Sequence, residues 1–171
     1  MRAEDIPARV LWAAELLAPR PRERLLEIGC GNGVAAQLLC ATLSGGDMLA
    51  IDRSATAVSR TTRRCAGFVA DGRLRVEQSD LSALRVDTAS FDAALAINVN
   101  VFWTSSAEDE LAVLRGALRP KGRLVLVYGQ GPGSVDDRQA KISQHLRDAH
   151  FTVTATYSED AGHAVIAVRA G

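Results

Sequence analysis

Glycines alternate with other residues directly after an apolar run near the start of the chain. The stretch Leu25–Val34 reads Leu-Leu-Glu-Ile-Gly-Cys-Gly-Asn-Gly-Val, with glycines at positions 29, 31 and 33. Glycine has no Cβ and adopts positive φ freely, so the chain can turn sharply and a ligand can lie against its main chain. A helix expected at residues 34–43 would point its free N–H groups at that ligand. The stretch predicts a nucleotide-binding turn between a strand and a helix.

The glycine spacing and the nearby acids indicate which nucleotide this turn suits. A dinucleotide turn has the spacing G-x-G-x-x-G, whereas position 34 is Val and the pattern is G-x-G-x-G. Glu27 stands two residues before the first glycine, where a carboxylate would repel a phosphate and attract an ammonium group or a ribose hydroxyl. Asp52 and Asp80 close the next two apolar runs, and Asp52 is placed to accept both hydrogen bonds of a ribose diol. This pattern favours a nucleoside with a cationic tail and disfavours a nicotinamide oxidoreductase.

Five segments, in order and suitably spaced, resemble the class I S-adenosylmethionine-dependent methyltransferases. They are residues 25–33, 50–54, 78–81, 90–94 and 118–124, so the resemblance spans nearly all of the chain. It implies that Glu27 and the glycine backbone hold the methionine end of the cofactor. It also implies that Asp52 holds the ribose hydroxyls and that Asp80 with Leu81 meets the adenine. The cofactor-binding residues implied in full are Glu27, Gly29, Cys30, Gly31, Gly33, Asp52, Arg53, Asp80, Leu81 and Asn98.

The resemblance implies an α/β fold, a Rossmann-like three-layer α/β/α sandwich. Its seven-stranded, mostly parallel sheet would have the order 3-2-1-4-5-7-6, with strand 7 antiparallel. The sequence patterns predict strands at residues 25–28, 48–51, 75–78, 91–98, 123–128, 151–157 and 163–168. They predict helices at residues 6–18, 34–43, 54–66, 107–118 and 135–149.

Single residues mark some boundaries of these elements. Ser54 is expected to cap its helix, and Gly67 is expected to end it. Lys121 departs from the family, which usually has a second glycine after this proline, and the departure affects a turn only. We expect one domain over residues 1–171, with an N-terminal lid helix in 1–20 and the core in 21–171.

The run that follows the fourth strand is expected at the mouth of the cleft, because ligands of doubly wound sheets bind beyond the carboxyl ends of strands. Asn98 and Asn100 there offer amide groups near the reacting methyl. Phe102 and Trp103 are either apolar walls for a substrate or packing beneath the next helix. The aromatic-proline tetrapeptide typical of many amino and nucleobase methyltransferases is absent, which disfavours those acceptors.

The fifth strand ends at a glycine-rich loop, residues 129–133, which either closes over a substrate or only connects two elements. Tyr128 and Gln130 are the side chains to test there. With Asn98, Asn100 and Trp103, Tyr128 completes the candidates for positioning the acceptor. The cleft-facing runs hold no convincing general base, and we expect a mechanism of proximity and in-line displacement.

The charge composition indicates which classes of partner the protein can bind. Lys plus Arg and Asp plus Glu number 20 each, so bulk charge points to no polyanionic partner. Six arginines gather between positions 53 and 75, namely Arg53, Arg60, Arg63, Arg64, Arg73 and Arg75. They fit the solvated face of an outer helix and an edge strand better than a nucleic-acid patch. The balanced charge and the expected single small domain together favour a small-molecule methyl acceptor, and we expect a monomer or homodimer.

The spacing of the cysteines and the length of the apolar stretches indicate whether the protein binds a metal and in which compartment it works. The three cysteines, at positions 30, 40 and 65, have no metal-ligand spacing and suit a reducing cytosol, and we expect a cytoplasmic protein without a metal. No signal peptide and no stretch of membrane-spanning length is evident. Trp12, in the first helix, either touches a substrate or packs on the domain, and packing is favoured. The alternative function is a methyltransferase-like protein that binds the cofactor without turnover and acts as a binding or regulatory protein.

Overall fold

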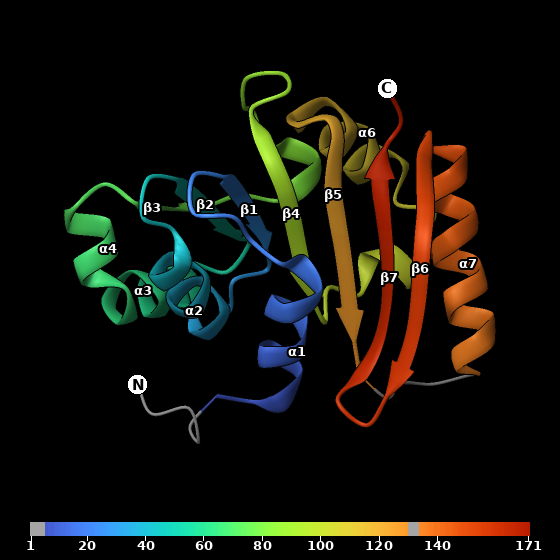
Figure 1. The fold of residues 1–171 in the computed structure, drawn as a ribbon, viewed down its shortest axis with the longest axis horizontal. Helices are drawn as coiled ribbons and strands as arrows, with labels where there is room; N and C mark the ends of the chain where they lie inside the picture. The colour runs from blue at the N-terminus through green and yellow to red at the C-terminus, as the bar shows by residue number, and fades with distance from the viewer. Residues whose placement is uncertain (1–5, 130–133) are drawn as a thin grey trace.

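Strands and helices alternate along the chain and build three layers (Figure 1). The computed structural model describes residues 6–129 and 134–171. The strands are β1 (Arg24–Ile28), β2 (Asp47–Asp52), β3 (Leu74–Gln78), β4 (Phe91–Ile97), β5 (Leu118–Tyr128), β6 (Phe151–Glu159) and β7 (Gly162–Arg169). The helices are α1 (Ala8–Leu17), α2 (Val34–Thr42), α3 (Ala55–Arg64), α4 (Ala66–Ala70), α5 (Val101–Thr104), α6 (Glu108–Ala117) and α7 (Val135–Asp148), with a 3-10 turn, η2 (Leu81–Ala83).

The seven strands form one sheet in the order β3-β2-β1-β4-β5-β7-β6. β1 pairs in parallel with β2 and β4, β2 with β3, and β4 with β5, whereas β7 is antiparallel to both β5 and β6. Figure 1 shows the arrow of β7 opposed to those of β5 and β6. The predicted fold class, strand order and antiparallel strand 7 are confirmed. The parallel strands bring their carboxyl ends to one edge of the sheet.

Strand residues alternate between two apolar clusters, one on each face of the sheet. Leu26 and Ile28 of β1 pack in the cluster that also holds residues of α6 and α7. Leu25 packs in the opposite cluster, with Ala13 and Leu17 of α1 and with residues of α2. Because both faces are covered, β1, β2 and β4 are almost continuously apolar, as is usual for a central parallel sheet.

Two element boundaries differ from the predictions. Gly67 does not end a helix, because α3 ends at Arg64 and the chain re-enters a helix that contains Gly67. Ser54 caps α3 as expected, since its Oγ accepts the N–H of Ala57. The expected loop at residues 158–162 is shorter, because β6 and β7 extend their pairing to Glu159 and Gly162.

The fifth strand begins earlier than expected. β5 starts at Leu118, and its pairing with β4 shifts register between Phe91 and Ala93 of β4. The expected turn at residues 120–122 is therefore contained in a bulged strand, with Lys121 at φ 65°. The chain still turns at these residues, because Lys121 has a positive φ and the pairing with β4 passes from Leu118 directly to Arg123.

Candidate active site

The glycine turn leaves β1 with all three glycines at positive φ, namely 73°, 56° and 76°. The N–H groups of Gly29 and Cys30 both donate to the carbonyl of Ile51 at the end of β2, at 2.8 and 3.0 Å. A Cβ at Gly33 would lie 2.9 Å from the Cα of Thr61 in α3, and a Cβ at Gly29 would lie 2.7 Å from Val99. The turn thus needs glycine for its backbone conformation and for close packing against its neighbours.

Asp52, the last residue of β2, is tied into this turn. Its Oδ2 accepts the N–H of Gly31 at 3.0 Å, and its Oδ1 accepts the N–H of Ser54 at 2.9 Å. Each carboxylate oxygen has a second lone pair, so Asp52 can still accept hydrogen bonds from a ligand. The side chain is therefore held in one orientation beside the glycine turn.

Glu27 lies beneath the same turn and is 3% exposed. Its Oε2 is buried and has no hydrogen-bond partner in the described part of the chain. Burial, with a smaller contribution from the charge of Asp52, raises the pKa of Glu27 to about 8. A buried carboxyl group with an unused oxygen is costly without a partner, and a cationic group would be a favourable one.

A cavity of about 290 Å³ opens at the carboxyl ends of the parallel strands. It is lined by Ile28, Gly29, Ile51, Asp52, Arg53, Ser79, Asp80, Leu81, Ile97, Asn98, Val99, Asn100, Val101 and Glu110. Of the sequence-predicted residues, the cavity gathers Gly29, Asp52, Arg53, Asp80, Leu81, Asn98 and Asn100. Glu27, Cys30, Gly31 and Gly33 are not among the lining residues, and they lie in or under the turn.

Several lining residues escaped sequence reasoning. Val99 and Val101 alternate with Asn98 and Asn100 in the sequence, so their positions beside these two predicted residues could have identified them as lining residues. Glu110 comes from α6 and reaches the cavity only through the packing of that helix, and no local pattern marks it. It adds a third carboxylate to the lining, beside Asp52 and Asp80.

Asn98 connects the cavity to the neighbouring strand end. Its backbone is at φ 58°, and its N–H donates to the carbonyl of Val127. Its Oδ1 accepts the N–H of Gly129 at 3.0 Å, which leaves the Nδ2 group for other partners. Asn98 therefore joins the end of β4 to the end of β5 and also faces the cavity.

Trp103 and Tyr128 stand outside the cavity lining. Tyr128 is 1% exposed, and its ring centre lies 5.3 Å from that of Trp103. Phe102 is buried in the cluster under α6 and α7, and Trp103 packs against that cluster. These aromatic side chains pack within the domain, and Asn98 and Asn100 are the positioning candidates that line the cavity.

The remaining sequence-predicted residues are Trp12, Gln130 and Cys30. Trp12 is half-buried and meets Tyr157 edge to face, with ring centres 6.5 Å apart. Gln130 and the other residues from 130 to 133 lie outside the described residues. Cys30 is buried, and its Sγ accepts a hydrogen bond from Thr61 at 3.4 Å, while burial raises its pKa to about 11. Cys30 is therefore a packed thiol and no nucleophile.

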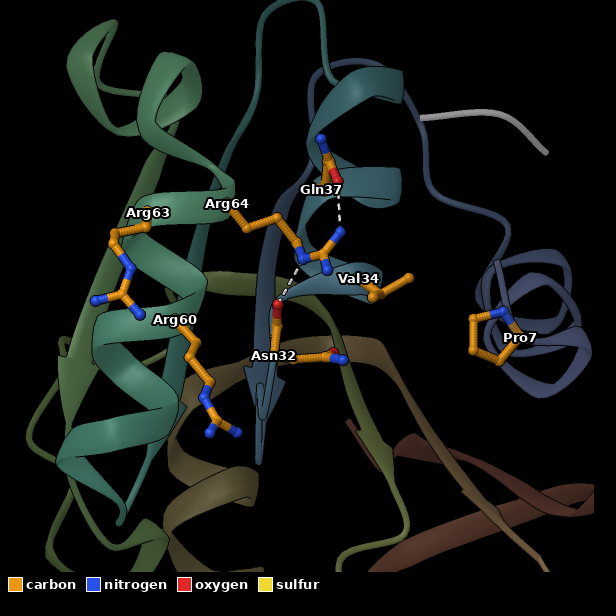
Figure 2. A pocket seen from close by; sticks show the side chains of 7 residues that line it. All are labelled: Pro7, Asn32, Val34, Gln37, Arg60, Arg63 and Arg64. Atoms are coloured by element: carbon orange, nitrogen blue, oxygen red, sulfur yellow. Dashed lines mark hydrogen bonds between the residues drawn. The ribbon is translucent and has the colours of Figure 1, made fainter. Parts of the chain in front are cut away.

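A wide second cavity, of about 830 Å³, lies beside the glycine turn and includes Asn32 and Val34 in its lining. Figure 2 shows Arg60, Arg63 and Arg64 of α3 along one wall and Pro7 on the opposite side. Arg64 Nε donates to the carbonyl of Asn32 at 2.7 Å and so fastens α3 to the turn. All three arginines are exposed, as expected for a solvated helix face.

Across residues 6–129 and 134–171, His, Cys, Asp and Glu side chains nowhere gather in threes in a way that could hold a metal ion. Over the same residues, none of the helices has the length and apolarity needed to cross a membrane.

Comparisons with known proteins agree with this geometry. A family model described as "Methyltransferase domain" matches residues 25–122. A protein-L-isoaspartate O-methyltransferase of Methylorubrum populi is 39% identical over 127 residues, which cover 74% of this chain and 55% of that protein. A trans-aconitate 2-methyltransferase of Deinococcus radiodurans is 31% identical over 157 residues, 92% of this chain and 52% of that protein. The chain thus spans about half the length of the curated relatives it matches.

Solved structures share the fold at low identity. A geranyl diphosphate methyltransferase in complex with SAM superposes with a TM-score of 0.78 at 16% identity, over 95% of this chain and 85% of that one. A SAM-dependent methyltransferase from Aquifex aeolicus superposes with a TM-score of 0.78 at 15% identity, over 93% and 88%.

Proposed function

Because the chain belongs to the class I S-adenosylmethionine-dependent methyltransferases, we propose that it binds this cofactor beside the glycine turn and transfers its methyl group to a small-molecule acceptor. The observation that carries the proposal is Glu27, a buried carboxyl group with one oxygen unused beneath that turn. An ammonium group is the partner that such a carboxyl suits, whereas a diphosphate would be repelled.

The residues present fit the cofactor. Glu27 and the glycine backbone would hold the amino acid end, and Asp52, oriented by the N–H groups of Gly31 and Ser54, would accept the ribose hydroxyls. Asp80 and Leu81, which follow β3 in the chain and line the cavity, would meet the adenine. The missing Cβ at Gly31, which would have no heavy atom nearer than 4.0 Å, leaves the backbone of the turn open to close approach.

When bound, the cofactor supplies an electrophilic methyl group on a sulfonium centre. The protein's part is to align an acceptor atom with that group and to exclude water, and such positioning supplies roughly 7 to 11 kcal/mol of a barrier. Asn98 lines the cavity, its Nδ2 has no hydrogen-bond partner among residues 6–129 and 134–171, and it is our candidate to orient the acceptor. No general base is assigned, which restricts the acceptor to atoms that carry no proton at working pH or that lose it to solvent.

The acceptor does not follow from the relatives. They are named for methylating groups as different as protein L-isoaspartate, trans-aconitate and 27-O-demethylrifamycin SV. We propose a small-molecule acceptor because Lys plus Arg and Asp plus Glu number 20 each, which gives no electrostatic basis for a nucleic-acid acceptor.

Calorimetric titration of the folded protein with S-adenosylmethionine and S-adenosylhomocysteine tests the proposal. We expect both to bind and reduced nicotinamide coenzyme to give no heat, and an absence of heat from both sulfur compounds would refute the assignment. Incubation with a methyl-labelled donor and a metabolite extract then separates an enzyme from a silent binding protein. Label in a metabolite supports turnover, while cofactor binding without any labelled product supports the alternative.

A further inference from the structure

Three acidic residues open α6, and one of them lines the cavity that we assign to the cofactor. Glu108, Asp109 and Glu110 form the first turn of this helix. Glu110 is half-buried and lines the cavity of about 290 Å³, whereas Glu108 lines a different cavity and Asp109 is exposed. The helix dipole stabilises an acid in the first turn wherever it points, so the helix alone gives no reason for Glu110 to lie in the cavity. Glu110 is therefore the acid of this turn that a bound cofactor can contact.

Asp80 presents a second unused carboxylate to the same cavity. It precedes the 3-10 turn η2, but its side chain makes no capping hydrogen bond, and only its main-chain carbonyl accepts the N–H of Ala83, at 3.1 Å. Among residues 6–129 and 134–171, neither Asp80 nor Glu110 makes a side-chain hydrogen bond or an ion pair. Asp52, in contrast, already accepts two main-chain N–H groups. Two of the three carboxylates in the lining are therefore available to a ligand with all their acceptor positions.

The elements that carry these two carboxylates touch each other. Helix α6 contacts η2, and Leu81 and Leu111, which directly follow Asp80 and Glu110, are buried in one apolar cluster. The buried leucines fix the main chain beside each acid, because core side chains have few alternative positions. The fold thus carries Asp80 and Glu110 to one cavity from two packed elements, while Asp52 stands at the glycine turn.

The rest of the lining suits a flat ring with hydrogen-bond donors on its edge. Aliphatic side chains contribute much of it, namely Ile28, Ile51, Leu81, Ile97, Val99 and Val101. Among the lining residues, Arg53 is the one basic side chain, against the carboxylates of Asp52, Asp80 and Glu110. A ring in this cavity would bury its faces against aliphatic groups, and the carboxylates accept only from N–H or O–H groups.

Adenine has the edge that two carboxylates require. Its 6-amino group carries two N–H bonds that point to opposite sides in the plane of the ring, whereas guanine and hypoxanthine carry an oxygen at this position. We propose that Asp80 and Glu110 each accept one of these N–H groups, so that Glu110 selects an adenosyl cofactor against an inosyl one. This inference rests on the proposed function and adds to it a residue of α6 that touches the base. An oxygen in place of the amino group would face both carboxylates and be repelled.

Calorimetric titration with S-adenosylhomocysteine and S-inosylhomocysteine, whose bases differ at position 6, tests this inference. We expect the wild type to bind the adenosyl compound about 30-fold more tightly, the scale of one lost hydrogen bond to a charged group. Glu110→Gln keeps the size of the side chain, and its amide can donate to the oxygen of the inosyl compound. The preference for the adenosyl compound should therefore fall about tenfold in Glu110→Gln. Asp80→Asn should lower the preference in the same direction.

Asp109→Asn is the matched control. It removes a negative charge from the same turn of α6 at a residue that does not line the cavity, so the preference should stay within about twofold of the wild type. Because the preference is a ratio measured on one protein, a misfolded fraction lowers the binding of both compounds alike and leaves the ratio unchanged. The inference is overturned if the wild type binds both compounds equally, or if Glu110→Gln keeps the same preference as Asp109→Asn.

The failure of this inference can be told from a failure of the proposed function. Binding of S-adenosylhomocysteine with a preference that does not depend on Glu110 would refute the role of Glu110 and leave the methyltransferase assignment standing. An absence of binding of either compound to the folded wild type would refute the cofactor site itself, and the inference with it.

Discussion

The two halves of the sheet's carboxyl edge carry opposite charge. At β1 to β3, Glu27, Asp52 and Asp80 gather around the glycine turn and the cavity. At β5 and β7, Arg9 and Arg138 bracket Gly129. Each carboxylate of the acidic half lies within two residues of the end of its own strand. The basic corner, in contrast, joins Arg9 and Arg138, which are 129 positions apart in the sequence. The difference teaches that local motifs can place carboxylates at strand ends, while the approach of two arginines to one residue requires the whole fold.

Gly33→Ala tests whether the glycine turn in the acidic half tolerates a side chain. Alanine there would have to adopt a φ near 76° and would meet the Thr61 backbone of α3 at 2.9 Å. We expect a loss of about 2 to 4 kcal/mol in the free energy of unfolding, together with weaker cofactor binding. Thermal melting measures the first effect. Gly67→Ala is the control, because no atom lies within 4 Å of a Cβ there, and equal melting temperatures for the two variants would contradict this account.

Asp52→Ala removes the charge that we assign to the ribose hydroxyls. It also leaves the N–H groups of Gly31 and Ser54 without their acceptor. We expect affinity for S-adenosylhomocysteine to fall by about 100-fold, the scale of two lost charge-assisted hydrogen bonds, while the chain stays folded. Calorimetry gives the affinity. Asp71→Ala, which removes an exposed partner of Arg73, should leave it unchanged, and unchanged affinity in Asp52→Ala would refute the assigned role.

Glu27 makes the stability of the cofactor-free protein depend on pH. Its pKa in the folded state, about 8, is above the ordinary value of 4.5, so the folded state binds the extra proton between these values. The stabilisation is complete at low pH and is lost as pH rises through 8, on the order of 2 kcal/mol between pH 6 and pH 9. Melting curves of the wild type and of Glu27→Gln across this range measure the effect. Glu27→Gln should show a flatter pH profile, and parallel profiles would disprove the buried carboxyl group as the cause.

Gly129→Ala probes the basic corner with a smaller cost. A Cβ there meets only the tip of the Arg9 side chain, which can move away, in contrast to the helix backbone beside Gly33. We expect less than about 1 kcal/mol of lost stability. Thermal melting measures this loss. A loss of stability as large as that of Gly33→Ala would contradict this account.

Arg63→Ala should have the smallest effect. Arg63 is exposed on α3 and donates only to Ser59 among the interactions described, so we expect melting temperature and cofactor affinity to match the wild type. A gel-shift assay with RNA and DNA should show no binding in either protein. Nucleic-acid binding that disappears in Arg63→Ala would contradict the interpretation of this face as solvated.

Local pattern predicted most of the fold. The glycine turn, the cap at Ser54 and the succession of the main strands and helices along the chain could be predicted, because apolar period, caps and turns act within a few residues. The order of the strands within the sheet was implied by the family resemblance and is confirmed. The helix end at Gly67 was wrong, since packing of Phe68 and Val69 on the core carries the chain into another helical turn. The start of β5 was missed because pairing with β4 extends the strand through a proline-containing bulge.

The sequence by itself determined the acidic half of the site, since Glu27, Asp52 and Asp80 each follow directly from the strand that carries them and parallel strands align their carboxyl ends. Only the tertiary structure decided that Tyr128 is buried, that Glu110 reaches the cavity and that Arg9 and Arg138 meet. The physical reason is the distance along the chain over which each interaction acts. Hydrogen bonds and periodicity within a strand or turn are local, whereas the approach of α1, α6 and α7 depends on how apolar faces pack across the whole sheet.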